Sequence, residues 1–278
     1  MADLLNLTLG FSPCPNDTFM FDALVNGRIN TTGINFHVEY DDVESLNRRA
    51  INHELDISKI SFAVYDKIKS EYELLTSGSA LGNGVGPLLI SKNIFSDPEK
   101  QIKSVAIPGK NTTAYYLFKI FYPELTTVKE MVFSDIENAV LDGHADAGVI
   151  IHENRFTYEA KGLVKISDLG DLWQKKTGEP IPLGGIVIRR NLSALTKQRV
   201  NNLLRESIKY AFANPEASSN YVKSHAQEMS DEVRKKHIQL YVNEFSLDLG
   251  MKGRAAILKF LGYELNRKKC KEPEVFIE

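Results

Sequence analysis

Apolar and polar positions follow a repeated order of strand, polar turn and helix along the chain. Residues 7–11 (LTLGF) have the period of a strand, and the prolines of segment 12–17 (SPCPND) interrupt it. Residues 18–25 then favour a short helix that ends at Gly27. The same order predicts further strands at 34–39 and 56–61 and helices at 43–52 and 62–68.

Two later segments share a pattern of small residues, an apolar run and a basic end: 86–92 (GPLLISK) and 184–190 (GGIVIRR). Both predict extended strands. Between them we expect a second series, with a strand at 104–107, a loop at 108–111, a helix at 112–121 and a strand at 147–151. After Arg190 the pattern becomes amphipathic and helical over 197–213, 215–227, 230–242 and 250–262.

Strands that alternate with helices predict an α/β fold with mostly parallel sheets. Segments 50–61 and 139–151 both read as helix end, turn, aspartate and strand, so one lobe is expected to copy the other. The two extended segments are expected to be hinge crossings. Residues 1–90 with 190–278 would then form a larger lobe, and 91–189 an inserted one. A central cleft between two such lobes is the usual place for a small-molecule site.

Composition and charge narrow the classes of function. Hydrophobic residues make up 43% of the chain and charged residues 25%, and the formal net charge of -2 gives no basic field for nucleic acid. The basic cluster 267–271 is interpreted as a solvated tail. The start of the chain shows no signal peptide, no apolar run could cross a membrane, and two cysteines make no disulfide framework. We therefore expect a cytoplasmic protein without a membrane partner.

The candidate chemistry lies in loops that follow strands, because ligands of open α/β sheets bind beyond the carboxyl ends of the strands. Segment 108–113 (PGKNTT) opens a helix whose first N–H groups suit an anion, and Thr112 and Thr113 add hydroxyl donors. A simple helix cap at Asn111 or Thr112 explains the same residues. Both interpretations stay open from the sequence.

Two further segments offer polar side chains. Ser12 and Asn16 are expected to face the cleft, whereas Asp17 is interpreted as a helix N-cap. Lys59 lies inside a predicted strand, with Ser61 on the same face by the period of two. A buried lysine needs a partner or a function, and an edge strand with Lys59 in solvent is the alternative.

His152 is the most informative candidate, because it follows a buried strand and precedes the polar residues Glu153, Asn154 and Arg155. Imidazole titrates near neutral pH and can accept and return a proton, although a structural histidine bound to carbonyl groups is the alternative. Cys14 has no histidine close in sequence and is not favoured as a nucleophile. No pair of histidines has metal-ligand spacing and no Cys-x-x-Cys occurs, so no metal is predicted.

Four segments carry a family resemblance: 10–19 (GFSPCPNDTF), 58–61 (SKIS), 112–114 (TTA) and 150–153 (IIHE). They resemble the 1,4-dihydroxy-6-naphthoate synthases, a family on the futalosine route to menaquinone, and the likeness covers nearly the whole chain. The family's fold is similar to that of type 2 periplasmic binding proteins, which agrees with the two-crossing layout.

The resemblance implies a lyase that converts the anionic substrate cyclic dehypoxanthine futalosine to 1,4-dihydroxy-6-naphthoate, with release of a sugar-derived fragment and without metal or organic cofactor. It places the family's proton-accepting histidine on His152. It implies substrate contacts at the following residues of the third strand and the helix start: Ser58, Lys59, Ile60, Ser61, Thr112 and Thr113.

Two other functions remain open from the sequence. A chorismate dehydratase of the same pathway would act on a similar fold, but the base expected at His152 favours the synthase. A cytoplasmic solute-binding or sensor protein would bind a ligand without changing it, and fold alone does not separate these cases. The chain is expected to be a monomer or a homodimer.

Overall fold

The computed structural model describes residues 4–226, 230–265 and 275–277. The chain divides into two compact units, which we call unit 1 (residues 1–81 and 184–278) and unit 2 (residues 82–183). Three features of the sequence lie wholly or partly outside the described residues: the basic cluster 267–271, Cys270, and the end of the helix predicted at 215–227.

Unit 1 is built on a mixed sheet whose strands run in the order β2-β1-β3-β11-β4, with β5 also paired to β11. Strands β2 and β3 are parallel to β1, whereas β11 is antiparallel to both β3 and β4. The strands are β1 Leu5–Phe11, β2 Ile34–Tyr40, β3 Ile57–Ser61, β4 Tyr72–Leu74, β5 Ala80–Gly82 and β11 Ile181–Arg189.

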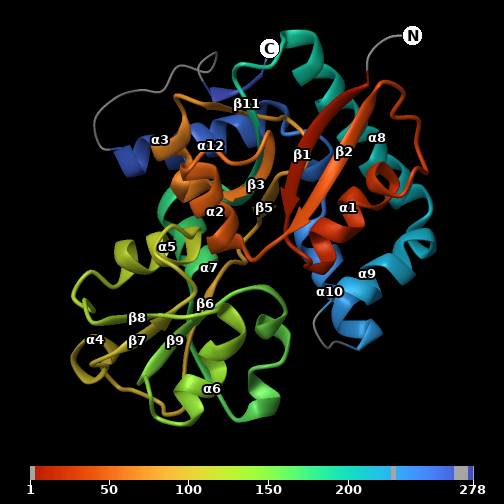
Figure 1. Cartoon of the computed structure of the whole chain (residues 1–278). Coiled ribbons are helices and arrows are strands. Elements are labelled where there is room, and N and C mark those ends of the chain that lie inside the picture. The colour runs from red at the N-terminus through yellow and green to blue at the C-terminus, as the bar shows by residue number, and fades with distance from the viewer. Residues whose placement is uncertain (1–3, 227–229, 266–274, 278) are drawn as a thin grey trace. The chain divides into compact units, whose positions relative to one another are not determined.

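The helices of unit 1 come from both ends of the chain (Figure 1). Helix α1 packs against α8, α9 and α10, so the amino-terminal and carboxy-terminal parts share one core. The helices are α1 Pro15–Val25, α2 Val43–Ile51, η1 Phe62–Val64, α3 Tyr65–Ile68, α8 Ala194–Ala213, η5 Pro215–Ser218, α9 Ser219–His225, α10 Asp231–Tyr241, α11 Glu244–Leu247 and α12 Gly250–Leu265.

Unit 2 has a sheet of its own in the order β10-β6-β9-β7-β8. Strands β8 and β9 are parallel to β7, and β6 is antiparallel to β9 and β10. Its strands are β6 Leu88–Ser91, β7 Val105–Ile107, β8 Val128–Glu130, β9 Ala147–Ile150 and β10 Val164–Asp168. Its helices are α4 Pro98–Gln101, α5 Thr113–Phe121, η2 Phe133–Asp135, α6 Ile136–Leu141, η3 His152–Phe156, η4 Glu159–Lys161 and α7 Leu169–Thr177.

The two units repeat one chain path, as the sequence echo predicts. The order β2-β1-β3-β11 of unit 1 corresponds to β8-β7-β9-β6 of unit 2, with the same parallel and antiparallel pairs. The aspartates of the two similar segments, Asp56 and Asp146, also make equivalent hydrogen bonds. Asp56 accepts the backbone N–H of Thr8 at 2.8 Å, and Asp146 accepts that of Ser104 at 2.9 Å, so each ties the start of one strand to its parallel neighbour.

The predicted strands and helices are confirmed as far as the described residues reach, with the helix predicted from residue 215 divided into η5 and α9, and with two corrections. The sheets are mixed and not mostly parallel, because β11 and β6 run opposite to their neighbours. Helix α1 begins at Pro15, three residues before the predicted start at Thr18, since proline at the first helical position loses no hydrogen bond. The N-cap position is therefore Cys14, and the N-cap predicted at Asp17 is wrong.

Candidate functional site

In unit 1, the turn after β1 brings polar side chains around one carboxylate, that of Asp17. Ser12 Oγ donates to Asp17 Oδ2 at 2.7 Å, and Asn16 Nδ2 donates to Asp17 Oδ1 at 2.8 Å. The ammonium of Lys59 lies 3.0 Å from Asp17 Oδ1. Because α1 starts at Pro15, Asn16 and Asp17 lie in its first turn, and Asp17 reaches Lys59 of the neighbouring strand β3.

Lys59 is buried in the middle of the sheet and not in solvent at an edge. Its strand, β3, lies between β1 and β11, and Lys59 is 5% exposed. Besides Asp17, its ammonium reaches the carbonyl oxygen of Gly78 at 3.3 Å. A Cβ at Gly184 would lie 2.8 Å from the carbonyl oxygen of Ile60 and 3.2 Å from Lys59 Cε, so glycine lets β11 approach β3 beside the lysine side chain. The interpretation of a buried, partnered lysine is confirmed.

The other predicted residues of β3 are also buried. Ser58 Oγ donates to the carbonyl oxygen of Lys59 at 3.0 Å, and the Ile60 side chain is fully buried. Asn47 of α2 accepts the backbone N–H of Ser61 at 2.8 Å and donates to Ser61 Oγ at 3.1 Å. The strand end is therefore held rigidly by side chains of unit 1.

In unit 2, Thr112 is the N-cap of α5. Its hydroxyl accepts the backbone N–H of Tyr115 at 3.2 Å and donates to the carbonyl oxygen of Gly109 at 2.7 Å. The Thr113 hydroxyl donates to the carbonyl oxygen of Leu183 at 2.8 Å. Both hydroxyl groups therefore make hydrogen bonds to the backbone of the protein itself. The amides of Thr113 and Ala114 lie in the first turn, where the helix itself supplies no carbonyl partner and an anion is favoured.

His152 follows β9 and has a left-handed backbone with φ 56°. Such angles are uncommon for residues other than glycine and cost free energy, so they persist only where the surroundings impose them. Its ring lies against Phe133 of η2, with ring centroids 4.8 Å apart. The left-handed backbone places the His152 imidazole beyond the carboxyl end of β9, where ligands of α/β sheets bind.

The residues after His152 anchor this turn on two sides. Arg155 donates to the carbonyl oxygen of Gly86 and to Asp168 Oδ2, both at 2.6 Å. Asn154 Nδ2 donates to Glu137 Oε2 at 2.5 Å. Since η3 is fixed to α6, to the segment before β6 and to the start of α7, the position of His152 is preorganised.

Two carboxyl groups lie at η3: that of Glu137, which is bonded to Asn154, and that of the partly buried Glu153. Glu137 is fully buried and is paired with Lys161 at 2.7 Å. Burial raises the pKa of Glu153 above its ordinary value, and the charge of Glu137 raises it further. The backbone N–H of Glu153 and the charge of Lys161 act in the opposite direction.

The sequence did not reveal several of these residues. His237 of α10 is buried, and its Nε2 lies 3.0 Å from Asn16 Oδ1. Asn47 and Glu137 lie on amphipathic helices, where a polar residue at a buried position was the only available signal. The roles of the predicted site residues, and the prediction that no metal is bound, stay predictions.

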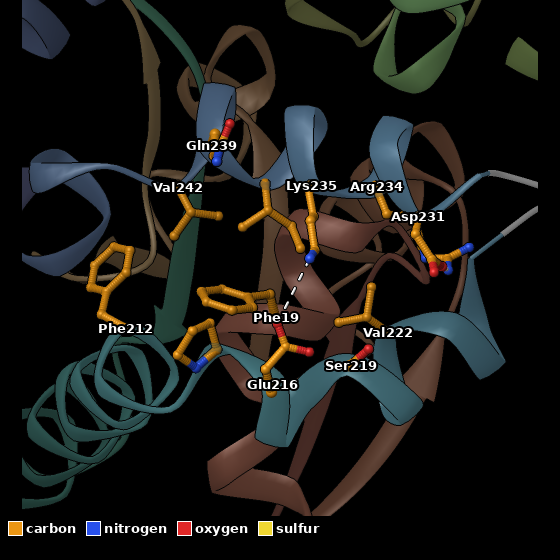
Figure 2. A pocket seen from close by; sticks show the side chains of 12 residues that line it. Phe19, Phe212, Glu216, Ser219, Val222, Asp231, Arg234, Lys235, Gln239 and Val242 are labelled. Atoms are coloured by element: carbon orange, nitrogen blue, oxygen red, sulfur yellow. Dashed lines mark ion pairs between the residues drawn. The ribbon is translucent and has the colours of Figure 1, made fainter.

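A pocket of about 520 Å³ lies elsewhere in unit 1, among α8, η5, α9 and α10. Figure 2 shows apolar side chains such as Phe19 and Val222 in it, with the ion pair of Lys235 and Glu216 at 3.7 Å. No predicted site residue is among the described residues that line it. In the part of the chain that the structure describes, no helix is long and apolar enough to span a membrane.

Comparison with known proteins identifies close relatives. A family model described as menaquinone biosynthesis matches residues 7–264. The 1,4-dihydroxy-6-naphtoate synthase of Thermus thermophilus is 44% identical over 253 residues, which cover 91% of this chain and 92% of the relative. The enzyme of the same name from Streptomyces coelicolor is 43% identical over 256 residues, which cover 90% of each chain. These matches bear out the predicted resemblance.

Solved structures confirm the fold class. Protein AF1704 of Archaeoglobus fulgidus matches with a TM-score of 0.86 and 33% identity, over 94% of this chain and 97% of that one. The periplasmic aliphatic sulphonate binding protein SsuA of Escherichia coli matches with a TM-score of 0.65 and 12% identity, over 98% and 92% of the two chains. The second likeness shows the fold alone, which is that of the periplasmic binding proteins.

Proposed function

This chain belongs to the menaquinone biosynthesis family, and from that premise we propose that it is a lyase that converts cyclic dehypoxanthine futalosine to 1,4-dihydroxy-6-naphthoate. Two relatives that carry the name of this activity cover about nine-tenths of the chain. The observation that supports a catalytic role within the chain is the left-handed His152 at the end of β9.

In this proposal the neutral imidazole of His152 accepts a proton from carbon beside a carbonyl group of the substrate. The electron pair left behind drives cleavage of the carbon–carbon bond to the sugar-derived fragment, and aromatisation of the new ring makes the cleavage favourable. A positioned base contributes about 10²–10⁴-fold to a rate. The anchors at Asn154 and Arg155 support this role, because they hold the base in one orientation.

The other predicted residues have binding roles in the proposal. The amides at the start of α5, at Thr113 and Ala114, would hold an anionic or carbonyl oxygen of the substrate. Ser58 and Ser61 would contact the substrate from the end of β3. Lys59 is already paired with Asp17, which supports a role in ordering Ser12 and Asn16, while direct contact of Lys59 with a substrate carboxylate stays a prediction.

A turnover assay tests the proposal. The purified full chain, given cyclic dehypoxanthine futalosine without added metal or cofactor, is expected to form 1,4-dihydroxy-6-naphthoate. His152→Ala should lower kcat by about 10²–10⁴-fold, with a circular dichroism spectrum like that of the wild type. His53→Ala is the matched control, because His53 also has a left-handed backbone, with φ 60°, but lies in a turn before β3.

Three outcomes would contradict the proposal. Equal kcat values for wild type and His152→Ala would mean that the histidine takes no part in the mechanism. Saturable binding without product would favour a solute-binding protein. Turnover of chorismate in place of the proposed substrate would favour a chorismate dehydratase.

A further inference from the structure

At the His152 turn, unit 2 brings two carboxyl groups and one ammonium group together. Glu137 of α6 is fully buried, and the Glu153 carboxyl lies close enough for the two charges to repel. The cation that serves this cluster is Lys161, whose ammonium lies 2.7 Å from Glu137 Oε2 and whose side chain is 47% exposed. One ammonium therefore faces two carboxyl groups.

Glu137 receives the side-chain hydrogen bonds that this cluster offers. Its Oε2 accepts hydrogen bonds from Asn154 Nδ2 at 2.5 Å and from Lys161 Nζ at 2.7 Å. Such charge-assisted bonds stabilise the ionised form. Glu153 has no comparable set of donors: its Oε2 is buried and lacks a hydrogen-bond partner among the described residues.

A second ionised carboxylate would be poorly compensated at this place. Burying a charge without a partner is so costly that a carboxyl group takes up a proton instead. Burial and the neighbouring charge of Glu137 both act in that direction on the pKa of Glu153. Glu137 Oε1 is also buried without a hydrogen-bond partner among the described residues.

We propose that Glu153 is a second catalytic residue: a carboxylic acid, protonated at rest, that donates its proton to the departing fragment while His152 accepts one from the substrate. The inference rests on the proposed function. Glu153 follows His152 in η3 and is only partly buried as a residue, and a carboxylate oxygen of Glu153 lies within 4.8 Å of a ring nitrogen of His152, so both groups can reach one substrate.

The proposed step is balanced in protons and electrons. A C–H bond of the substrate breaks and an N–H bond forms on His152, while the C–H electron pair becomes a double bond of the new ring. The carbon–carbon bond to the fragment breaks, and its electron pair goes to the fragment. That pair takes the proton of Glu153, which becomes a carboxylate. Transfer of the proton from His152 back to Glu153 restores the resting state, and no oxidant or reductant is needed.

Glu153→Gln tests the inference sharply, because the amide has the shape of a protonated carboxyl and no acidic proton. If Glu153 is the general acid, kcat should fall by about 10²–10⁴-fold, with a much smaller change in KM. If Glu153 has only a structural role, the isosteric amide should keep activity close to that of the wild type. The matched control is Glu159→Gln in the adjacent η4, whose exposed side chain accepts a hydrogen bond from Tyr158 at 2.8 Å.

Infrared difference spectroscopy gives a readout that does not need turnover. The spectrum of wild type minus Glu153→Gln, near neutral pH, should show the carbonyl band of a protonated carboxyl group, shifted in heavy water. A band of ionised carboxylate in its place, or a Glu153→Gln variant within about twofold of wild-type kcat, would overturn the inference while leaving the proposed function intact. Wild-type protein that makes no product would instead overturn the proposed function, and the acid role with it.

Discussion

The turns after β3 and β9 occupy the same place in the repeated path of the two units, yet they differ in chemistry. After β3 the chain enters η1 with Phe62, a fully buried core residue, and Asn47 of the preceding helix holds Ser61 by two hydrogen bonds. After β9 the chain enters η3 with His152 in a left-handed conformation, and Glu137 of the preceding helix holds Asn154.

The two turns also differ in how the charges near them are compensated. At β3, Asp17 and Lys59 compensate each other one to one, and Ser12 and Asn16 complete the bonds to the carboxylate. Around η3, a single ammonium group, that of Lys161, lies near the two carboxyl groups of Glu137 and Glu153. A compensated pair preorganises a surface, whereas an uncompensated acid next to a strained base can exchange protons. The comparison therefore supports the proposed division of roles, with binding at the first turn and proton transfer at the second.

The largest expected effect comes from breaking the compensated pair in unit 1. Asp17→Asn leaves the ammonium of Lys59 buried without an anion and should lower the free energy of unfolding by about 3–5 kcal/mol. Urea denaturation measures the loss. The control is Asp66→Asn, whose pair with Lys69 is exposed and should contribute less than about 1 kcal/mol. Equal losses for the two variants would contradict the compensated-pair description.

Asn47→Ala tests how firmly the turn after β3 is held. The buried N–H of Ser61 loses its acceptor at 2.8 Å, so the free energy of unfolding should fall by about 1–3 kcal/mol. Asn52→Ala, at the exposed end of the same helix, should change it by no more than about 0.5 kcal/mol. A loss at Asn47 as small as that at Asn52 would count against rigid anchoring.

Alanine variants are usually more stable than glycine variants. The backbone strain at His152 predicts that this order of stability is reversed there. His152→Gly should be more stable than His152→Ala by about 1 kcal/mol, because glycine adopts φ 56° without steric cost. At Phe62, which has no left-handed backbone, glycine should be less stable than alanine. Thermal unfolding of the four variants compares the two turns directly, and the same order at both positions would exclude strain.

The smallest effect is a pH dependence of stability at Glu153. Because its pKa in the folded protein is raised, folding favours the protonated form, and this contribution is lost as pH rises from the ordinary value of 4.5 through the raised pKa. Glu153→Gln does not titrate. Its stability relative to wild type should therefore increase over that pH window, as measured by urea unfolding at several pH values. A difference that stays constant with pH would mean that the pKa is not raised.

Much of the fold followed from local pattern. The alternation of apolar residues predicted β1, β3, β7 and β9, and the echo of 50–61 and 139–151 predicted the repeated path. Strands β4 (YEL), β8 (VKE) and β10 (VKISD) were missed, because each contains charged residues and lacks the apolar run that marks β7 and β9. The start of α1 was misplaced, because prolines were interpreted only as breaks.

The sequence by itself determined where chemistry could lie: at strand ends, with a histidine after a buried strand and a lysine inside another. Only the tertiary structure decided the partners. His237 meets Asn16 across 221 positions of the chain, and Glu137 meets Asn154 across 17. Periodicity reports which face of an element is buried, but the pairing of side chains depends on the order of the strands and on which helices cover them. For that reason the charge balance around Glu153 could be counted only in the folded protein.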